Sequence, residues 1–178
     1  MAAVAQVARE PGLDQQEFSG VDFRNALGAF ATGVTVITTQ GVDHPFGMTA
    51  NAFSSVSLDP PLVLICVISG THGADTIERN GVFAVNILGS DHEPISRYFS
   101  AKDRPRGADA FGEIPHSFAV TGSPILHGAA GYLDCRVHAM HEAGDHIVFI
   151  GEVVALGHDS EAKPLLFHGG RYCFVKDE

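Results

Sequence analysis

The chain has 178 residues, of which 45% are hydrophobic and 18% charged, a composition typical of a folded globular domain. Its formal net charge of −10 argues against a nucleic-acid partner, because surfaces that bind nucleic acids are basic. No apolar run is long enough to span a bilayer, and residues 1–6 lack the features of a secretory signal. The three cysteines form no C-x-x-C pair and are expected to be reduced, buried thiols of a cytoplasmic protein.

The N-terminal residues 1–20 are expected to form a partly disordered arm, with a short helix near residues 14–18. Residues 21–178 show no internal repeat and no second compositional regime, so they are expected to form one domain. Between Asp22 and Gly33, apolar residues recur at helical spacing, which predicts a helix with Asp22 as its N-cap and Gly33 as the residue that ends it.

Most of the remaining chain reads as β-strand. The predicted strands are residues 34–39, 47–59, 62–68, 82–88, 132–139, 147–156, and a closing hairpin of 165–167 with 172–175. Thr71 is expected to cap a helix through Asn80, and Ser90 with Glu93 to form the capping box of a helix through Phe99. Residues 102–124 read mostly as loop. Because most connections are too short for parallel crossovers, these elements predict a mainly β fold, an antiparallel β-barrel with peripheral helices.

Two of the predicted strands differ in how they should be covered. Residues 62–68 are continuously apolar, which indicates that both faces of this strand are buried. Residues 132–139 alternate, which places Asp134 and Arg136 on a face that meets water.

Residues 47–61 are dominated by small and hydroxylated side chains and contain no cation. Thr49 and Asn51 supply donors and acceptors, while Ala50 and Ala52 leave space between them. This composition suits a flat polar ring lying against the backbone. The spacing alone favours a simpler interpretation, an ordinary half-buried strand with polar residues facing water.

Two weaker features could carry chemistry. Arg97, Lys102, Arg104 and Arg106 form a local positive patch that suits a phosphate, although such a run is more often a solvated loop. Residues 144–146, Gly-Asp-His, place an imidazole in a turn before a buried strand. That histidine either donates toward a bound ring or bonds the local backbone.

Signatures of other chemistries are missing from the sequence. There is no G-x-G-x-x-G after a strand, no G-x-x-x-x-G-K, no H-E-x-x-H and no G-x-S-x-G. His138 and His141 lie an odd number of residues apart, so on a strand their side chains leave opposite faces. No metal site is therefore predicted.

Segments spread along the chain resemble, in the same order, the short-chain flavin reductases, which are reductase components of two-component flavin-dependent monooxygenases. They are residues 23–39, 47–61, 83–88, 144–153 and 164–172. The resemblance implies an FMN-binding split β-barrel of antiparallel Greek-key topology that forms a homodimer. It also implies electron transfer from NADH or NADPH to FAD or FMN, with the reduced flavin leaving for a separate monooxygenase.

The resemblance also implies site residues. The isoalloxazine would lie against Thr49, Ala50, Asn51, Ala52, Phe53, Ser55 and Val56. The flavin phosphate would meet Ser69, Gly70 and Thr71 at a helix N-terminus, with Phe99, Lys102 and Arg104 near the phosphates or the adenosine. Gly144, Asp145 and Tyr172 would complete the cofactor site, and His146 would be the catalytic residue facing the nicotinamide. One departure is His72, where many members have another cation or a hydroxyl.

FAD and NADH are the expected pair, with FMN and NADPH as alternatives. The FAD preference depends on Lys102 and Arg104, and the NADH preference on the habit of the family. A non-catalytic flavin-binding protein on the same barrel is the main rival, and it leaves residues 144–146 without a role. An oxidase of the pyridoxamine-phosphate type would need more cations than the eleven present. A pure scaffold protein is the least favoured alternative.

Overall fold

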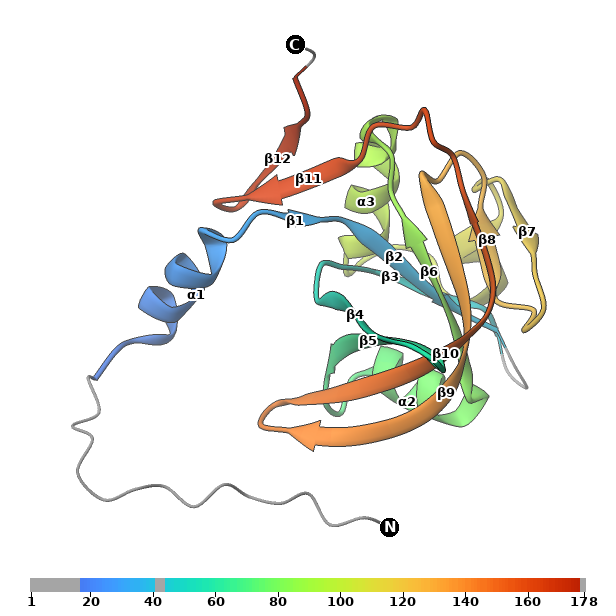
Figure 1. The fold of residues 1–178 in the computed structure, drawn as a ribbon, viewed down its shortest axis with the longest axis horizontal. Helices are drawn as coiled ribbons and strands as arrows, with labels where there is room; N and C mark the ends of the chain where they lie inside the picture. The colour runs from blue at the N-terminus through green and yellow to red at the C-terminus, as the bar shows by residue number, and fades with distance from the viewer. Residues whose placement is uncertain (1–16, 41–43, 177–178) are drawn as a thin grey trace.

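The structure is a computed structural model that describes residues 17–40 and 44–176 (Figure 1). Its helices are α1 (Gly20–Gly28), α2 (His72–Asn80) and α3 (Glu93–Ser100), with 3-10 helices at Ser90–His92 and Gly107–Phe111. Most of the predicted arm and of the predicted helix near residues 14–18 lies outside the described residues, and residues 17–18, which are described, are not helical. No helix in the described part of the chain is long and apolar enough to cross a membrane.

A seven-stranded antiparallel sheet forms the body of the molecule, in the order β3-β2-β6-β9-β10-β5-β4. Its strands are β2 (Thr35–Thr39), β3 (Phe46–Ala50), β4 (Phe53–Leu58), β5 (Pro61–Ile68), β6 (Val82–Ile87), β9 (Gly131–Ala143) and β10 (His146–His158). The two edge strands, β3 and β4, are consecutive in the chain and only two residues apart. The sheet must therefore curl until its edges meet, which gives the barrel-like shape in Figure 1.

The prediction of one strand over residues 47–59 is wrong in one respect, because the strand is interrupted at Asn51–Ala52. Before the interruption the chain pairs with β2, and after it the chain pairs with β5. The segment thus crosses the seam where the curled sheet closes. The backbone bonds Phe53 N–Asn51 O (3.0 Å) and Cys66 N–Ala52 O (3.1 Å) fix this crossing.

Two smaller sheets flank the body. One joins β1 (Thr32–Gly33), β11 (Leu165–His168) and β12 (Arg171–Phe174), and the other joins β7 (His116–Phe118) to β8 (Pro124–Leu126). The closing hairpin predicted around Gly169 and Gly170 is confirmed, and both glycines have positive φ. The region predicted as loop contains a 3-10 helix and β7 in addition.

Helix capping agrees with the prediction at one helix of the three. Thr71 caps α2 by accepting from the amide of Ala74. In α1 the N-cap is Ser19, not Asp22, because Asp22 is the third helical residue and completes a capping box with Ser19. In α3 the predicted capping box is absent, because Ser90 starts a separate 3-10 turn and bonds Asp91 instead.

The core has two parts, one on each side of the sheet. Inside the curl, Ile37, Ile65, Phe83 and Phe149 pack with Ile77 of α2. A second group, which includes Val34, Val36, Leu88, Phe99 and Leu165, packs α3 and the β11 hairpin on the outer face. Alternate residues of β2 serve the two groups, so β2 is buried on both sides and anchors the edge that carries β3.

Two predictions about strand faces are wrong. In β5 only one face is fully buried, at Val63, Ile65 and Val67, whereas the other face is half-covered and ends at Ile68, which is 55% exposed. In β9 Asp134 is fully buried, because its carboxylate accepts from the backbone amide and hydroxyl of Thr121 in the segment before β8 (2.8 and 2.5 Å). Arg136 is exposed, as predicted.

Candidate functional site

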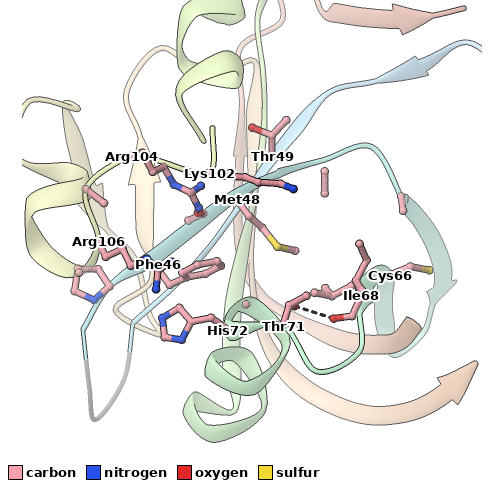
Figure 2. Close-up of a pocket in the computed structure, with 18 of the residues that line it drawn as sticks. Phe46, Met48, Thr49, Cys66, Ile68, Thr71, His72, Lys102, Arg104 and Arg106 are labelled. Atoms are coloured by element: carbon pink, nitrogen blue, oxygen red, sulfur yellow. Dashed lines mark hydrogen bonds between the residues drawn. The ribbon is translucent and has the colours of Figure 1, made fainter. Parts of the chain in front are cut away.

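A cavity of about 640 Å³ lies at the seam of the curled sheet (Figure 2). Its walls are β3 and the two-residue crossing, the end of β5, the start of α2, the 102–110 loop, and the first residue of β10. The residues whose side chains decide its chemistry are Phe46, Met48, Thr49, Ala50, Asn51, Ala52, Cys66, Ile68, Thr71, His72, Lys102, Arg104, Arg106 and His146. A volume of this size suits a small organic ligand.

The β3 wall is held close to α3 by two local features. A Cβ at Gly47 would lie 2.6 Å from the ring of Phe99, so only glycine allows this approach. The hydroxyl of Thr49 donates to the carbonyl of Ser96 in α3 (2.6 Å). Thr49 therefore links β3 to α3 through this hydrogen bond. The small side chains of Ala50 and Ala52 leave the crossing open to the cavity.

The cationic end of the cavity is formed by Lys102, Arg104 and Arg106. Arg104 is partly buried and donates to the carbonyls of Ala101 (2.6 Å) and Gly47 (2.5 Å). Its pKa is lowered, chiefly by the loss of hydration on burial. Within residues 44–176 no carboxylate forms a salt bridge with any of the three. The patch is therefore uncompensated and suits an anionic group.

Arg97, the fourth cation of the predicted patch, faces elsewhere. It pairs with Glu93 of its own helix (2.7 Å) and lies over the ring of Tyr172, 4.7 Å from the centroid. Its contacts secure α3 to the β11–β12 hairpin. They leave it outside the cavity.

The opposite end of the cavity is formed by Cys66, Ile68 and His146. Figure 2 shows Cys66 and Ile68 across the cavity from Arg104 and Arg106, and His146 pairs with Ile68 in the sheet. The imidazole Nδ1 lies 2.7 Å from Oδ1 of Asp145. That contact, first through the hydrogen bond and then through charge, lowers the pKa of the Asp145 carboxyl.

The start of α2 forms the cavity wall between the cationic end and the end at His146. The Thr71 hydroxyl accepts from the amide of Ala74 and donates to the carbonyl of Ile68 (2.7 Å), so the helix and the end of β5 form one unit. The first-turn residues His72 and Gly73 line the cavity. A helix N-terminus at this position favours negative charge.

The structure brings together about half of the residues expected at the site. Those that line the cavity are Thr49, Ala50, Asn51, Ala52, Thr71, Lys102, Arg104 and His146. Those that lie outside it are Phe53, Ser55, Val56, Ser69, Gly70, Phe99, Gly144, Asp145 and Tyr172.

The residues outside the cavity have other contacts. Phe99 is buried against Phe111 behind β3, and the Tyr172 hydroxyl bonds Ser96 (2.8 Å). Beyond the crossing, Ser55 and Val56 follow the exposed edge strand β4. Phe53 packs against the inner core.

Phe46, Met48, Cys66 and Ile68 line the cavity and were not expected there, and His72 and Arg106 also line it although neither was assigned to the cofactor site. His72 and Arg106 carried a usable signal, since one follows the predicted helix cap and the other belongs to the cationic run. The aliphatic, aromatic and thiol residues carried none, because their approach depends on the curl of the sheet.

The cavity fits a nucleotide that carries a flat ring. Ala50 at the end of β3 and the uncharged crossing offer a surface for the ring, and the patch without carboxylate partners offers charge for a phosphate. Among the described residues there is no cluster of His, Cys, Asp or Glu suited to a metal ion. The fold and the cavity together define a curled antiparallel β-sheet protein with a cavity suited to a nucleotide.

The comparisons give the family. A family model described as flavin reductase like domain matches residues 27–176, so the chain belongs to the flavin reductase-like domain family. An NADH-dependent FAD reductase of Streptomyces globisporus is 40% identical over 153 residues, which cover 85% of this chain and 84% of that protein. The flavin-dependent monooxygenase reductase subunit HsaB of Rhodococcus jostii is 38% identical over 156 residues, covering 88% and 78%.

A solved structure extends the likeness to the fold. The NADH:FAD oxidoreductase SgcE6 of Streptomyces globisporus C-1027 matches with a TM-score of 0.85 at 37% identity, covering 94% of this chain and 100% of that one. SgcE6 has also been solved in complex with NAD and FAD fragments. The predicted fold class, a mainly β antiparallel split barrel, is confirmed.

Proposed function

We propose that this chain is an NADH-dependent flavin reductase that reduces FAD and releases it to a separate monooxygenase. The observation that carries the proposal is the seam cavity, which joins an uncharged ring surface to a cationic end in a member of the flavin reductase-like family. FMN as flavin and NADPH as reductant are the alternatives. The match to an NADH-dependent FAD reductase supports the first pair.

Different parts of the cavity would bind the ring and the phosphate of the flavin. The isoalloxazine would lie along Ala50 and the crossing, and the phosphate end of the flavin nucleotide would point toward Lys102, Arg106 and the start of α2. The 102–110 loop lines this cationic end as far as Ala110, which supports FAD, because FAD has a diphosphate and an adenosine to place. His146 would stand at the nicotinamide side.

The chemistry demands little of the protein beyond position. The bound flavin supplies a ring that accepts a hydride from the nicotinamide of NADH. The chain must align two rings at close range and keep water from between them. Small residues at the crossing, and the apolar Met48 and Ile68 beside them, suit that task. No nucleophile or strong base is needed.

We also propose a homodimer. Helix α1 stands away from the barrel in Figure 1, and none of its residues is buried. A nine-residue helix is marginal in water without tertiary packing, yet Phe23 and Leu27 are more than half exposed. The half-covered face of β5, ending at Ile68 beside the cavity, also lacks a cover. A second copy that packs against these surfaces accounts for both.

The partner and the setting follow from the same reasoning. The match to a reductase subunit of a flavin-dependent monooxygenase supports an oxygenase that accepts the reduced flavin. The cysteines of the structure, Cys66, Cys135 and Cys173, are all unpaired, which supports the reducing cytoplasm. Residues 21–178 would act as one catalytic domain.

Steady-state oxidation of NADH and of NADPH, with FAD, FMN and riboflavin in turn, tests the function. We expect no oxidation without flavin, and the highest kcat/KM with NADH and FAD. Tight flavin binding without any oxidation of either nucleotide would identify the chain as a non-catalytic flavin carrier. Oxidation that persists after all flavin is removed would refute the proposal.

A further inference from the structure

Ser96 of α3 is fully buried and lies outside the cavity, yet both of its polar groups bond to other elements. Its backbone carbonyl accepts from the hydroxyl of Thr49 in β3 (2.6 Å), and its side-chain hydroxyl lies 2.8 Å from the hydroxyl of Tyr172 in β12. A serine inside a helix commonly bonds the carbonyl four residues earlier instead. Ser96 therefore connects the cavity wall to the C-terminal hairpin through two hydrogen bonds.

The first of these bonds determines how β3 presents its side chains to the cavity. A hydroxyl has a single proton, and that of Thr49 is donated to Ser96. Thr49 therefore points toward α3, and since side chains alternate along a strand, Met48 and Ala50 lie on the other side of β3 (Figure 2). Because β3 is an edge strand that pairs with β2 alone among the described strands, α3 adds the support that a second neighbouring strand would give. Ala50, where the ring surface begins, is thus placed by α3 as well as by the sheet.

The second bond holds α3 itself. The ring of Tyr172 packs edge-on against Phe167 in the paired strand β11, with 5.4 Å between the ring centroids, and the guanidinium of Arg97 lies over its face. These contacts fix the Tyr172 hydroxyl, which can donate to Ser96 or accept from it. Among the described residues Tyr172 is the one hydrogen-bond partner of the Ser96 side chain.

Loss of the Tyr172 hydroxyl would therefore affect the cavity. A buried hydroxyl without a partner is unfavourable, so Ser96 would turn to a carbonyl of its own helix. Such a bond bends helices, and a bend at Ser96 moves the carbonyl to which Thr49 donates. The displacement would reach Ala50 and the ring surface beside it.

We infer that Ser96 and Tyr172 are positioning residues for the flavin ring, which they support through Thr49 without contacting the ligand. The inference rests on the proposed function. The resemblance implied that Tyr172 contacts the cofactor directly, whereas here it lies outside the cavity and acts through two hydrogen bonds.

The first test is the Kd for FAD, measured by flavin fluorescence titration without NADH. Tyr172→Phe removes only the hydroxyl and should raise this Kd about threefold to tenfold, and Ser96→Ala should do the same because it removes the other half of the bond. Tyr132→Phe is the matched control, since it removes a tyrosine hydroxyl from β9 outside the cavity and should leave the Kd unchanged. A wild-type Kd in either Tyr172→Phe or Ser96→Ala would overturn the inference.

A double-mutant cycle tests the route through Thr49. Thr49→Val keeps the volume but removes the donor, so adding Tyr172→Phe to it should raise the Kd for FAD no further. Thr49→Ser keeps the donor, and in this background Tyr172→Phe should again raise the Kd about threefold to tenfold. If the effects of Thr49→Val and Tyr172→Phe multiplied, the two residues would act independently and the inference would be wrong.

A variant of the same hairpin separates positioning from folding. Phe167→Leu loosens the packing beside Tyr172 but keeps both hydroxyls, so urea unfolding should show lower stability while the Kd for FAD stays within about twofold of wild type. An equal loss of FAD affinity in Phe167→Leu and Tyr172→Phe would attribute the effect to a loosened hairpin and refute the inference. If the wild type bound FAD but oxidised no NADH, the proposed reductase would fail, whereas these Kd values would still test the positioning of the ring.

Discussion

At the scale of single residues, the cations of the cavity have different tasks. Arg104 uses its guanidinium on the carbonyls of Ala101 and Gly47, so it ties the 102–110 loop to β3. Lys102 and Arg106 are exposed at the cavity and make no such contacts with the residues that the structure describes. The expectation from sequence treated Lys102 and Arg104 alike. Which cation faces a ligand depends on carbonyls contributed by distant segments, and a sequence pattern does not display these.

We therefore predict that one charge-removing change lowers stability and that another weakens FAD binding. Arg104→Gln should lower the free energy of unfolding by about 1–3 kcal/mol, because it leaves carbonyls without their charged donor. Lys102→Gln should leave stability within about 0.5 kcal/mol of wild type and weaken FAD binding roughly threefold to tenfold. Urea unfolding and fluorescence titration measure the two quantities. Arg136→Gln, an exposed cation outside the cavity, is the control for net charge; equal loss of FAD affinity there would contradict a local role for Lys102.

The alkylation rates of the three cysteine thiols give an independent test of where FAD binds. Cys66 lines the cavity, Cys173 is half-buried outside it, and Cys135 is buried with its pKa raised to about 12 by loss of hydration. Since the thiolate is the reactive form, iodoacetamide should spare Cys135 in the folded protein. FAD should slow alkylation of Cys66 and leave Cys173 unaffected. Peptide mass spectrometry measures each rate, and unchanged alkylation of Cys66 at saturating FAD would place the flavin elsewhere.

His92 gives the protein a pH-dependent stability. Burial lowers the pKa of its imidazole, against the opposing effects of Asp91 and the His127 backbone. The unfolded chain therefore binds the proton more readily than the folded chain. The stabilisation is complete above the unfolded pKa of about 6.5 and is lost as the pH falls through that value toward the folded pKa. His92→Gln should reduce the loss of stability on acidification in urea titrations, whereas His168→Gln, an exposed histidine, should not. Identical pH profiles for wild type and His92→Gln would contradict this.

At the scale of elements, the sequence predicted where strands and helices lie better than how they are joined. The strands at β2, β5, β6, β9 and β10 and the helix at α2 were predicted from apolar periodicity and turn residues. The interruption of 47–59 was not, because it depends on the sheet closing upon itself, a long-range event. The burial of Asp134 was missed for the same reason, since its partner Thr121 belongs to another segment.

One glycine inside the barrel makes this packing testable. A Cβ at Gly151 of β10 would overlap the Phe83 ring and lie 2.9 Å from the Cβ of Cys135, within the inner core. Gly151→Ala should cost about 1–3 kcal/mol of unfolding free energy through overpacking. Gly33→Ala is the matched control, because nothing lies within 4 Å of its added Cβ. A neutral Gly151→Ala would show that the core between β6, β9 and β10 is looser than described.

At the scale of the whole molecule, the exposed helix α1 and the open face of β5 set an expectation for assembly. Replacing Phe23 and Leu27 together by serine should shift the protein from dimer to monomer in sedimentation velocity, with little change in the monomer's fold by circular dichroism, because neither side chain is buried. Glu78→Gln and Arg79→Gln on α2 serve as surface controls. A wild-type monomer at micromolar concentration with full activity would contradict the dimer.

The central claim is that FAD is reduced by NADH in the seam cavity, and anaerobic stopped-flow reduction of FAD tests it most directly. Ala52 is exposed and lines the cavity, so Ala52→Trp should fill the ring surface at little cost in folding, whereas Ser117→Trp adds the same bulk on β7 outside the cavity. Wild type and Ser117→Trp should bleach FAD on mixing with NADH. Ala52→Trp should require at least about tenfold more FAD for the same rate. Failure of the wild type to reduce FAD, or an Ala52→Trp rate equal to wild type at every FAD concentration, would contradict the account.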